Sequence, residues 1–178
     1  MEKVIIYGSR YGTARRYAQE LSRRTAIPAV SFTDVKDLPD YSVIIYVGAL
    51  YAGGVHGLRR TLSSLRPPLE QKLVIATVGL SDPQDEENTN NINASLMKQL
   101  SGDVYKKATI FHLRGGIVYG RLSLAHKTMM GLLYRKARTL PPDKQTAEVK
   151  AMVDSYGRVV DFVDFNTLDP IEQILALP

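Results

Sequence analysis

Gly8-Ser9-Arg10-Tyr11-Gly12-Thr13-Ala14 is a hydroxyl-rich stretch that directly follows the apolar run Val4-Ile5-Ile6-Tyr7. The run has the length and the β-branched content of a buried strand. Downstream, apolar residues recur at the spacing of one helical face, and they are Ala14, Tyr17, Ala18 and Leu21. The sequence therefore predicts a strand, a short loop and a helix at Tyr11–Arg24.

Four further apolar runs repeat this alternation of strand and helix along the chain. They lie at residues 29–32, 43–47, 73–78 and 109–113. Strands that are apolar on both faces and alternate with helices are typical of a parallel sheet covered on both sides. With right-handed crossovers, these five strands predict a three-layer, doubly wound α/β fold with strand order 2-1-3-4-5. The chain has 178 residues, so we expect residues 1–178 to form a single domain.

The loop at Ser9–Ala14 is expected at the ligand-binding edge of this sheet. In doubly wound sheets, ligands bind beyond the carboxyl ends of the strands where the strand order reverses, here between the first and third strands. Backbone N–H groups and the positive end of a helix dipole suit a phosphate there. Ser9 and Thr13 add hydroxyl donors, and Gly12 lets the backbone approach a ligand closely. The alternative is a capped turn that binds nothing, because Ser and Thr are common helix caps.

Two more loops follow strands that end at the same edge. Gly48-Ala49-Leu50-Tyr51-Ala52-Gly53-Gly54 follows the third strand, and its tyrosine and glycines are suited to lie flat against a planar ring. The alternative for this loop is a flexible turn with an incidental tyrosine. Gly79-Leu80-Ser81-Asp82 follows the fourth strand and is placed to close over the same pocket.

Together, the three loops resemble those of the flavodoxin family, in which the first loop holds the phosphate of FMN. The resemblance covers about residues 3–120, and residues 40–54 are similar to the family's third strand and flavin loop. It implies FMN as the cofactor, with the phosphate on Ser9, Arg10, Tyr11, Gly12, Thr13 and Ala14. It implies an isoalloxazine ring between Ala49, Leu50, Tyr51, Ala52, Gly53 and Gly54 on one side and Gly79, Leu80, Ser81 and Asp82 on the other. Ala14 departs from the hydroxyl residue that is commoner in the family at that position.

An additional helical segment is predicted near the C-terminus. Ser123–Arg138 combines basic residues with leucines and methionines in a helical pattern. Residues 149–163 show the spacing of a long amphipathic helix, and residues 164–178 are expected to form a helical turn or a frayed end. The stretch Phe111–Asp164 resembles the flavodoxin-like protoporphyrinogen dehydrogenases, which use FMN and pass electrons to a membrane quinone.

Three functions are compatible with these patterns. The resemblance favours an FMN-dependent oxidoreductase, similar to protoporphyrinogen dehydrogenase, with a quinone acceptor. The second is a flavodoxin-type electron carrier without its own substrate, although the net charge of +5 contrasts with the acidic charge of ordinary flavodoxins. The third is a binding module that keeps the fold without a flavin. No side chain stands out as a catalytic acid or base, since His56 and His112 are more typical of structural histidines.

Composition excludes several classes of site. Because the chain has no cysteine, disulfide frameworks and Cys-ligated zinc or iron–sulfur sites are excluded, and we expect no metal site. A receiver domain of the same topology needs an aspartate at the end of its third strand to accept a phosphoryl group. This chain has Gly48 and Ala49 there, so a role in phosphotransfer signalling is disfavoured. The chain shows no nucleic-acid recognition motif, so we expect no nucleic acid partner.

The basic helix predicted at residues 123–138 suggests peripheral contact with a membrane, because it combines cations with large apolar groups. The alternative is a helix packed on the domain with a solvated basic face. The sequence has no secretory signal and no apolar stretch near the ~20 residues that span a bilayer. We therefore expect a cytoplasmic protein, at most peripheral to a membrane.

Overall fold

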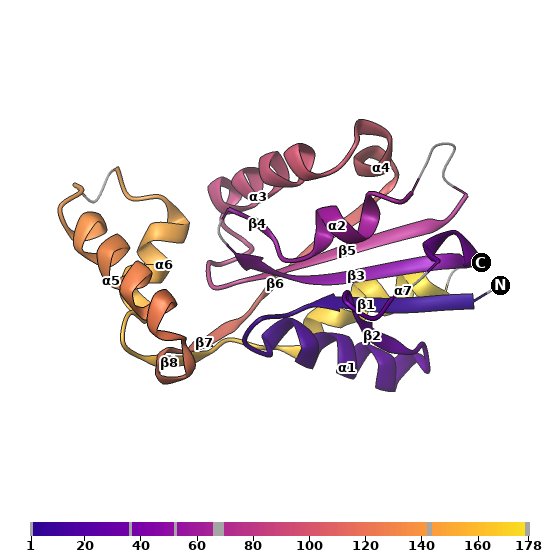
Figure 1. The fold of residues 1–178 in the computed structure, drawn as a ribbon, viewed down its shortest axis with the longest axis horizontal. Helices are drawn as coiled ribbons and strands as arrows, with labels where there is room; N and C mark the ends of the chain where they lie inside the picture. Colours follow the sequence, from indigo (N-terminus) through magenta and orange to yellow (C-terminus); the bar gives the residue numbers. More distant parts are fainter. Residues whose placement is uncertain (1, 36, 52, 66–69, 142–143, 177–178) are drawn as a thin grey trace.

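A computed structural model describes residues 2–35, 37–51, 53–65, 70–141 and 144–176 (Figure 1). Within these residues, a central sheet of five parallel strands has the order β2-β1-β3-β5-β6. The strands are β1 (Glu2–Gly8), β2 (Ala29–Ser31), β3 (Tyr41–Tyr51), β5 (Lys72–Gly79) and β6 (Thr109–Arg114). Counted along the chain, this order is the predicted 2-1-3-4-5, so the predicted fold class is confirmed.

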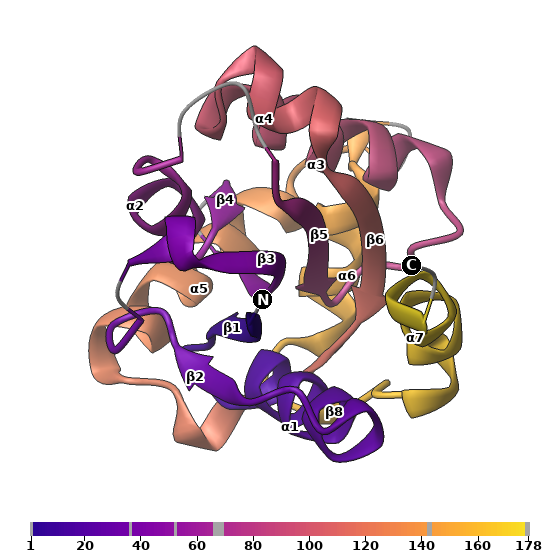
Figure 2. The ribbon, with the colours of Figure 1, turned by 90° about the vertical axis from the view of Figure 1, so that its right-hand side faces the viewer.

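Helices cover both faces of the sheet, which makes the three layers visible in Figure 2. One face carries α1 (Thr13–Thr25) and α7 (Asp169–Ala176), and the other carries α2 (Leu58–Leu62), α3 (Glu86–Gln99) and α4 (Gly102–Lys107). Alternate strand residues face opposite layers. Ile45 packs with the α1 side and Ile44 with the α2 side, and both are fully buried. Burial on both faces explains why these strands are apolar throughout.

The C-terminal tail is part of the core. Residues 164–176 form the short helix η4 (Phe165–Leu168) and α7, so for these residues the helical alternative is confirmed and the frayed end is wrong. Leu168 and Ile171 are fully buried against α1 and the sheet. The hydroxyl of Tyr17 on α1 donates to the Arg114 carbonyl (2.7 Å) and accepts from the Asp164 N–H (3.0 Å). These contacts tie the start of the tail to the end of β6.

Residues 116–161 form an insertion between β6 and the tail. It contains β7 (Gly116–Val118), η2 (Tyr119–Arg121), α5 (Leu124–Arg138), α6 (Ala147–Ser155) and β8 (Val159–Asp161), and β7 pairs antiparallel with β8. The amino end of β1 lies at the right of Figure 1, so the insertion at the left lies beyond the carboxyl ends of the parallel strands. The fold therefore places this insertion beside the predicted ligand-binding edge.

The insertion confirms one predicted helix and corrects another. The helix predicted at Ser123–Arg138 is present as α5. The long helix predicted at residues 149–163 is wrong, because α6 ends at Ser155 and a strand follows. Gly157 has a φ of 72°, which breaks the helix, and Val160 then pairs with Ile117 on β7. The apolar residues of this stretch serve two short elements rather than one helix.

Candidate functional site

The connection between β1 and α1 leaves the positive end of α1 without a side-chain cap. Its N-cap residue is Gly12, which has a φ of 98° and contributes no side-chain hydrogen bond. By contrast, α3, α5 and α6 are capped by the side chains of Asp85, Ser123 and Thr146. Because the first turn of α1 also lacks acidic residues, its N–H groups offer a site for an anion. The side-chain cap that the capped-turn alternative expected from Ser or Thr is therefore absent at the start of α1.

The side chains of the β1–α1 loop differ in what they offer to a ligand. Ser9 Oγ accepts from the Gly12 N–H (3.1 Å), and its own hydroxyl proton stays available to donate. Thr13 Oγ1 donates to the Gly116 carbonyl (3.3 Å), so that hydroxyl is engaged with the insertion. Arg10 and Tyr11 are exposed. Ala14 is fully buried in the core, and only its backbone faces the anion site.

The segment predicted as a loop at Gly48–Gly54 is largely a β-hairpin. Strand β3 continues to Tyr51, and Leu50 and Tyr51 pair with Val55 and Gly54 of β4 (Gly54–Val55). Gly53 has a φ of 78° in the turn, and Ala52 lies outside the described residues. The expectation of an irregular loop is therefore wrong at residues 48–51 and 54, because antiparallel pairing extends the strand beyond its apolar run.

Side chains of α3 fix this hairpin. Gln99 Oε1 accepts from the Val55 N–H (3.0 Å), and Ser95 Oγ donates to the Gly53 carbonyl (2.5 Å). These two bonds hold the hairpin against the helical layer, so Tyr51 extends from an anchored element.

The third predicted segment follows β5 and is held by a residue that sequence reasoning missed. Gly79 ends β5, and Leu80, Ser81 and Asp82 connect it to α3. Arg114, at the end of β6, donates from Nε to the Leu80 carbonyl (3.2 Å) and lies 3.9 Å from the Asp82 carboxylate. Arg114 follows the fifth parallel strand, so the rule that located the other loops also applies to it.

The three predicted segments meet at one edge of the sheet. Gly8 pairs with Gly48 in the register between β1 and β3, and Ala49 pairs with Val78 between β3 and β5. A Cβ on Gly8 would lie 1.9 Å from the His56 carbonyl oxygen, so only glycine fits where the chain after β4 crosses the end of β1. The predicted juxtaposition of the loops is thus present in the fold.

His126 on α5 joins two of these segments. The hydroxyl of Tyr11 contacts its Nδ1, and the hydroxyl of Tyr51 contacts its Nε2. Both tyrosine rings meet the imidazole edge-to-face, with centroid distances of 5.6 Å for Tyr11 and 5.2 Å for Tyr51. The Arg10 guanidinium lies 5.0 Å from the centroid of the Tyr51 ring. His126 lies within the basic helical segment predicted at Ser123–Arg138, and its sequence position gives no sign of these two contacts.

The other two histidines have structural surroundings. His56 lies edge-to-face against Phe32, and burial lowers its pKa, with a further contribution from the positive charge of Arg10. His112 on β6 hydrogen-bonds Thr77 through Nδ1 (2.8 Å), and burial lowers its pKa. Within the part of the chain that the structure describes, no three His, Asp or Glu residues gather to hold a metal ion.

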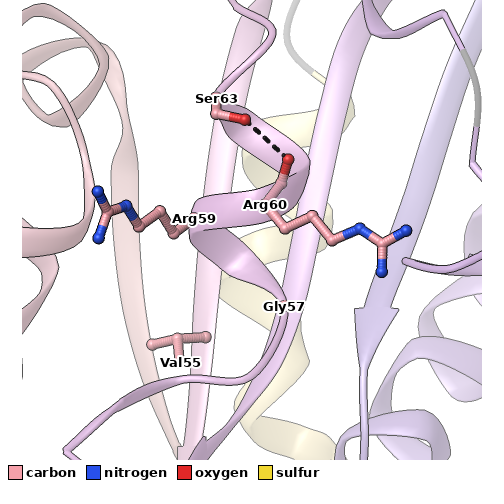
Figure 3. A pocket seen from close by; sticks show the side chains of 5 residues that line it. All are labelled: Val55, Gly57, Arg59, Arg60 and Ser63. Carbon is pink, nitrogen blue, oxygen red and sulfur yellow. Dashed lines mark hydrogen bonds between the residues drawn. The ribbon is translucent and has the colours of Figure 1, made fainter.

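A shallow depression lies between the β4 end of the hairpin and α2 (Figure 3). It is lined by Val55, Gly57, Arg59, Arg60 and Ser63. The side chains of Arg59 and Arg60 point to opposite sides of the helix, and Ser63 donates to the Arg60 carbonyl (2.9 Å). Because the two guanidinium groups do not converge, the depression offers no shared anion site.

Comparison with known proteins identifies the family. A family model described as "Flavodoxin domain" matches residues 4–143, which include most of β1 and all of the β3–β4 hairpin, β5 and α5. The chain belongs to this flavodoxin domain family. A search of curated proteins finds no match.

Solved structures of two flavodoxins and one flavoprotein are similar to this chain at low identity. A flavodoxin variant from Pseudomonas aeruginosa is 17% identical, covering 78% of this chain and 97% of that one, with a TM-score of 0.43. A flavoprotein in complex with FMN from Lactobacillus acidophilus NCFM is 11% identical, covering 64% and 91%, with a TM-score of 0.43. A flavodoxin from the domain Archaea is also 11% identical, covering 64% and 83%, with a TM-score of 0.41.

Proposed function

We propose that this flavodoxin-domain protein binds FMN at the carboxyl edge of its sheet and acts as a redox flavoprotein. The observation that carries the proposal is the uncapped N-terminus of α1, which faces the same edge as the Tyr51 hairpin. Family membership supports a flavin as the ligand of that edge. When bound, the isoalloxazine ring supplies the electron-transfer chemistry, and the protein supplies binding, orientation and electrostatics.

The residues present fit the phosphate group. A Cβ built on Gly12 meets no atom within 4 Å, so the space where a side chain of residue 12 would lie is open. The N–H groups of Thr13 and Ala14, with the hydroxyl of Ser9, would hold the phosphate, and Arg10 adds positive charge beside them. Tyr51 would be the ring neighbour of the flavin. The segment at 79–82, held by Arg114, would border the ring's other side.

FMN uptake by the purified protein tests this function. We expect FMN to bind at micromolar concentration, with quenched flavin fluorescence and a shifted visible absorption band. Riboflavin, which lacks the phosphate, should bind about tenfold or more weakly, because it loses charge-assisted hydrogen bonds to the α1 N-terminus. Absence of FMN uptake would refute the flavoprotein proposal, and equal affinity for riboflavin would refute the phosphate site.

We further propose an oxidoreductase with a porphyrinogen as electron donor and a quinone as acceptor, rather than a simple carrier. The insertion at residues 116–161 supports this, because it contacts both proposed FMN segments and a minimal carrier does not need it. Anaerobic mixing of the FMN-loaded protein with protoporphyrinogen should bleach the flavin band, and a quinone should restore it. If neither change occurs, the electron-carrier alternative is favoured.

The quinone proposal leads us to propose peripheral contact between α5 and an anionic membrane surface. Leu124 and Leu132 on α5 are 83% and 63% exposed, and Met129 and Leu133 are also exposed. The last turn of α5 carries three cations, Arg135, Lys136 and Arg138. Exposed apolar groups beside cations suit an interfacial helix on anionic lipid. None of the described helices is long and apolar enough to cross a bilayer.

Vesicle flotation tests this contact. The protein should float together with vesicles that contain phosphatidylserine. When the vesicles are neutral, the protein should remain at the bottom of the gradient. Leu132→Glu should abolish flotation, because it places a carboxylate within the exposed apolar group. Met97→Glu is the matched control, since Met97 is 54% exposed on α3, away from α5. Equal flotation of wild type and Leu132→Glu would contradict the proposed surface.

A further inference from the structure

Three side chains from distant parts of the sequence meet at the edge of the proposed FMN site. Tyr11 and His126 are 115 residues apart, and Tyr51 and His126 are 75 residues apart. His126 is only 7% exposed, although it lies on α5, whose other side chains are mostly solvent-facing. A buried histidine with a polar partner at each nitrogen indicates a specific role for its ring.

The imidazole ring can satisfy both hydroxyl groups at once. A neutral histidine has one N–H donor and one acceptor nitrogen, and a tyrosine hydroxyl can either donate or accept. One ring nitrogen can therefore donate to one tyrosine while the other accepts from the second. Ser123 Oγ lies 3.1 Å from Nδ1 and also caps the helix by accepting from the His126 N–H (3.3 Å). The start of α5 thus fixes the ring beside both tyrosines.

The two tyrosines belong to different segments of the proposed site. Tyr51 extends from the hairpin that Gln99 and Ser95 hold against α3. Tyr11 lies in the β1–α1 loop, where the Ser9 side chain accepts a hydrogen bond from the Gly12 N–H within the loop itself. The contacts of His126 therefore join this loop to the anchored hairpin, beside the Arg10 guanidinium that lies 5.0 Å from the centroid of the Tyr51 ring.

Contacts with α1 and within the insertion support the position of α5. Arg16 on α1 pairs with Asp161 on β8 (2.8 Å). Inside the insertion, Tyr134 of α5 stacks on Tyr156 at 4.0 Å with an interplanar angle of 7°, and Tyr119 packs against the same ring. A binding residue is placed most accurately when the elements behind it are themselves held in place.

We infer that His126 is a positioning residue: it sets the Tyr11 loop and the Tyr51 hairpin at the separation that FMN requires. The identity of the ligand, FMN, rests on the proposed function, whereas the contacts of His126 with Tyr11 and Tyr51 are present in the structure without it. His126 acts through the two tyrosines, so its loss should loosen the phosphate loop and reorient the Tyr51 ring. The flavin ring would then experience a different environment even when FMN still binds.

Substitutions of His126 separate its two contacts. His126→Ala should weaken FMN binding about tenfold and change the visible circular dichroism of bound FMN. The amide of His126→Asn reaches roughly the place of Nδ1, so it should restore part of the affinity through Tyr11. The longer His126→Gln reaches roughly the place of Nε2 and should restore the dichroism through Tyr51. His112→Ala is the matched control, because His112 is partly buried on β6 and bonds Thr77.

Hydrogen exchange of the FMN-free protein gives a readout that needs no ligand. His126→Ala should speed amide exchange at residues 9–12, whereas His112→Ala should leave that segment unchanged. If wild type and His126→Ala share the same exchange, affinity and dichroism, the inference is overturned. If the wild type takes up no FMN, the proposed function fails, and the exchange at residues 9–12 alone decides whether His126 positions the loop.

Discussion

Replacing Gly12 with aspartate is expected to weaken FMN binding by more than about a hundredfold. Replacing it with asparagine should weaken FMN binding by roughly tenfold at most. Gly12 is the N-cap of α1, and its left-handed backbone has open space where a side chain would lie. A carboxylate there would face the phosphate across a few ångströms, and two like charges at about 4 Å repel by about 4 kcal/mol at an effective dielectric constant near 20. Asparagine has the same shape without the charge and tolerates a left-handed backbone.

The two variants can be compared by titrating each protein with FMN at low ionic strength. The thermal unfolding midpoint of the FMN-free proteins is the control, and it should be similar for both variants because their backbone strain is the same. Raising the salt concentration should recover part of the loss in Gly12→Asp but not in Gly12→Asn, since screening acts only on the charge. If both variants bind FMN like the wild type, the phosphate does not lie at the α1 N-terminus.

The location of the candidate site could be predicted from sequence because it depends on local patterns. The apolar runs predict the strands. Ligands of doubly wound sheets bind beyond the carboxyl ends of the strands, and this predicts that the loops after those ends form the site. The same rule applied to the fifth strand points to Arg114, which holds residues 80 and 82 in the structure. His126 has no such signal. Its partners lie 115 and 75 residues away, and only the folded insertion brings them together.

The C-terminal third shows where periodicity is ambiguous. The apolar residues at 149–163 match a helical spacing, yet Gly157 divides them between α6 and β8. A glycine inside a helical pattern can mark the end of a helix, and Gly157 lies between the end of α6 and the start of β8. In the tail, Leu168, Ile171 and Leu175 recur at the spacing of one helical face, which is typical of a packed helix. Burial of these residues follows from the position of α7 beside α1, which sequence spacing alone does not reveal.

Leu168→Ala is therefore expected to lower the free energy of unfolding by about 3 kcal/mol, within the range for fully buried leucines. Leu168 is completely buried in the cluster that also contains Tyr17 and Ile171, so alanine would leave a cavity between α1, the sheet and the tail. That loss is a large part of the 5–15 kcal/mol that stabilises an ordinary domain.

Urea unfolding followed by circular dichroism measures this change, and Leu124→Ala provides the matched control. Leu124 is 83% exposed on α5, so the same truncation there should alter the unfolding free energy by less than about 0.5 kcal/mol. Because Leu168 lies in η4, outside the β1–α1 loop and the β3–β4 hairpin, the folded fraction of Leu168→Ala should still bind FMN with wild-type affinity. Equal stability of the two variants would mean that the tail contributes nothing to the core. A loss of FMN affinity at full folding would mean instead that the tail controls the anion site through α1, whose first turn contains Ala14 of the same core cluster.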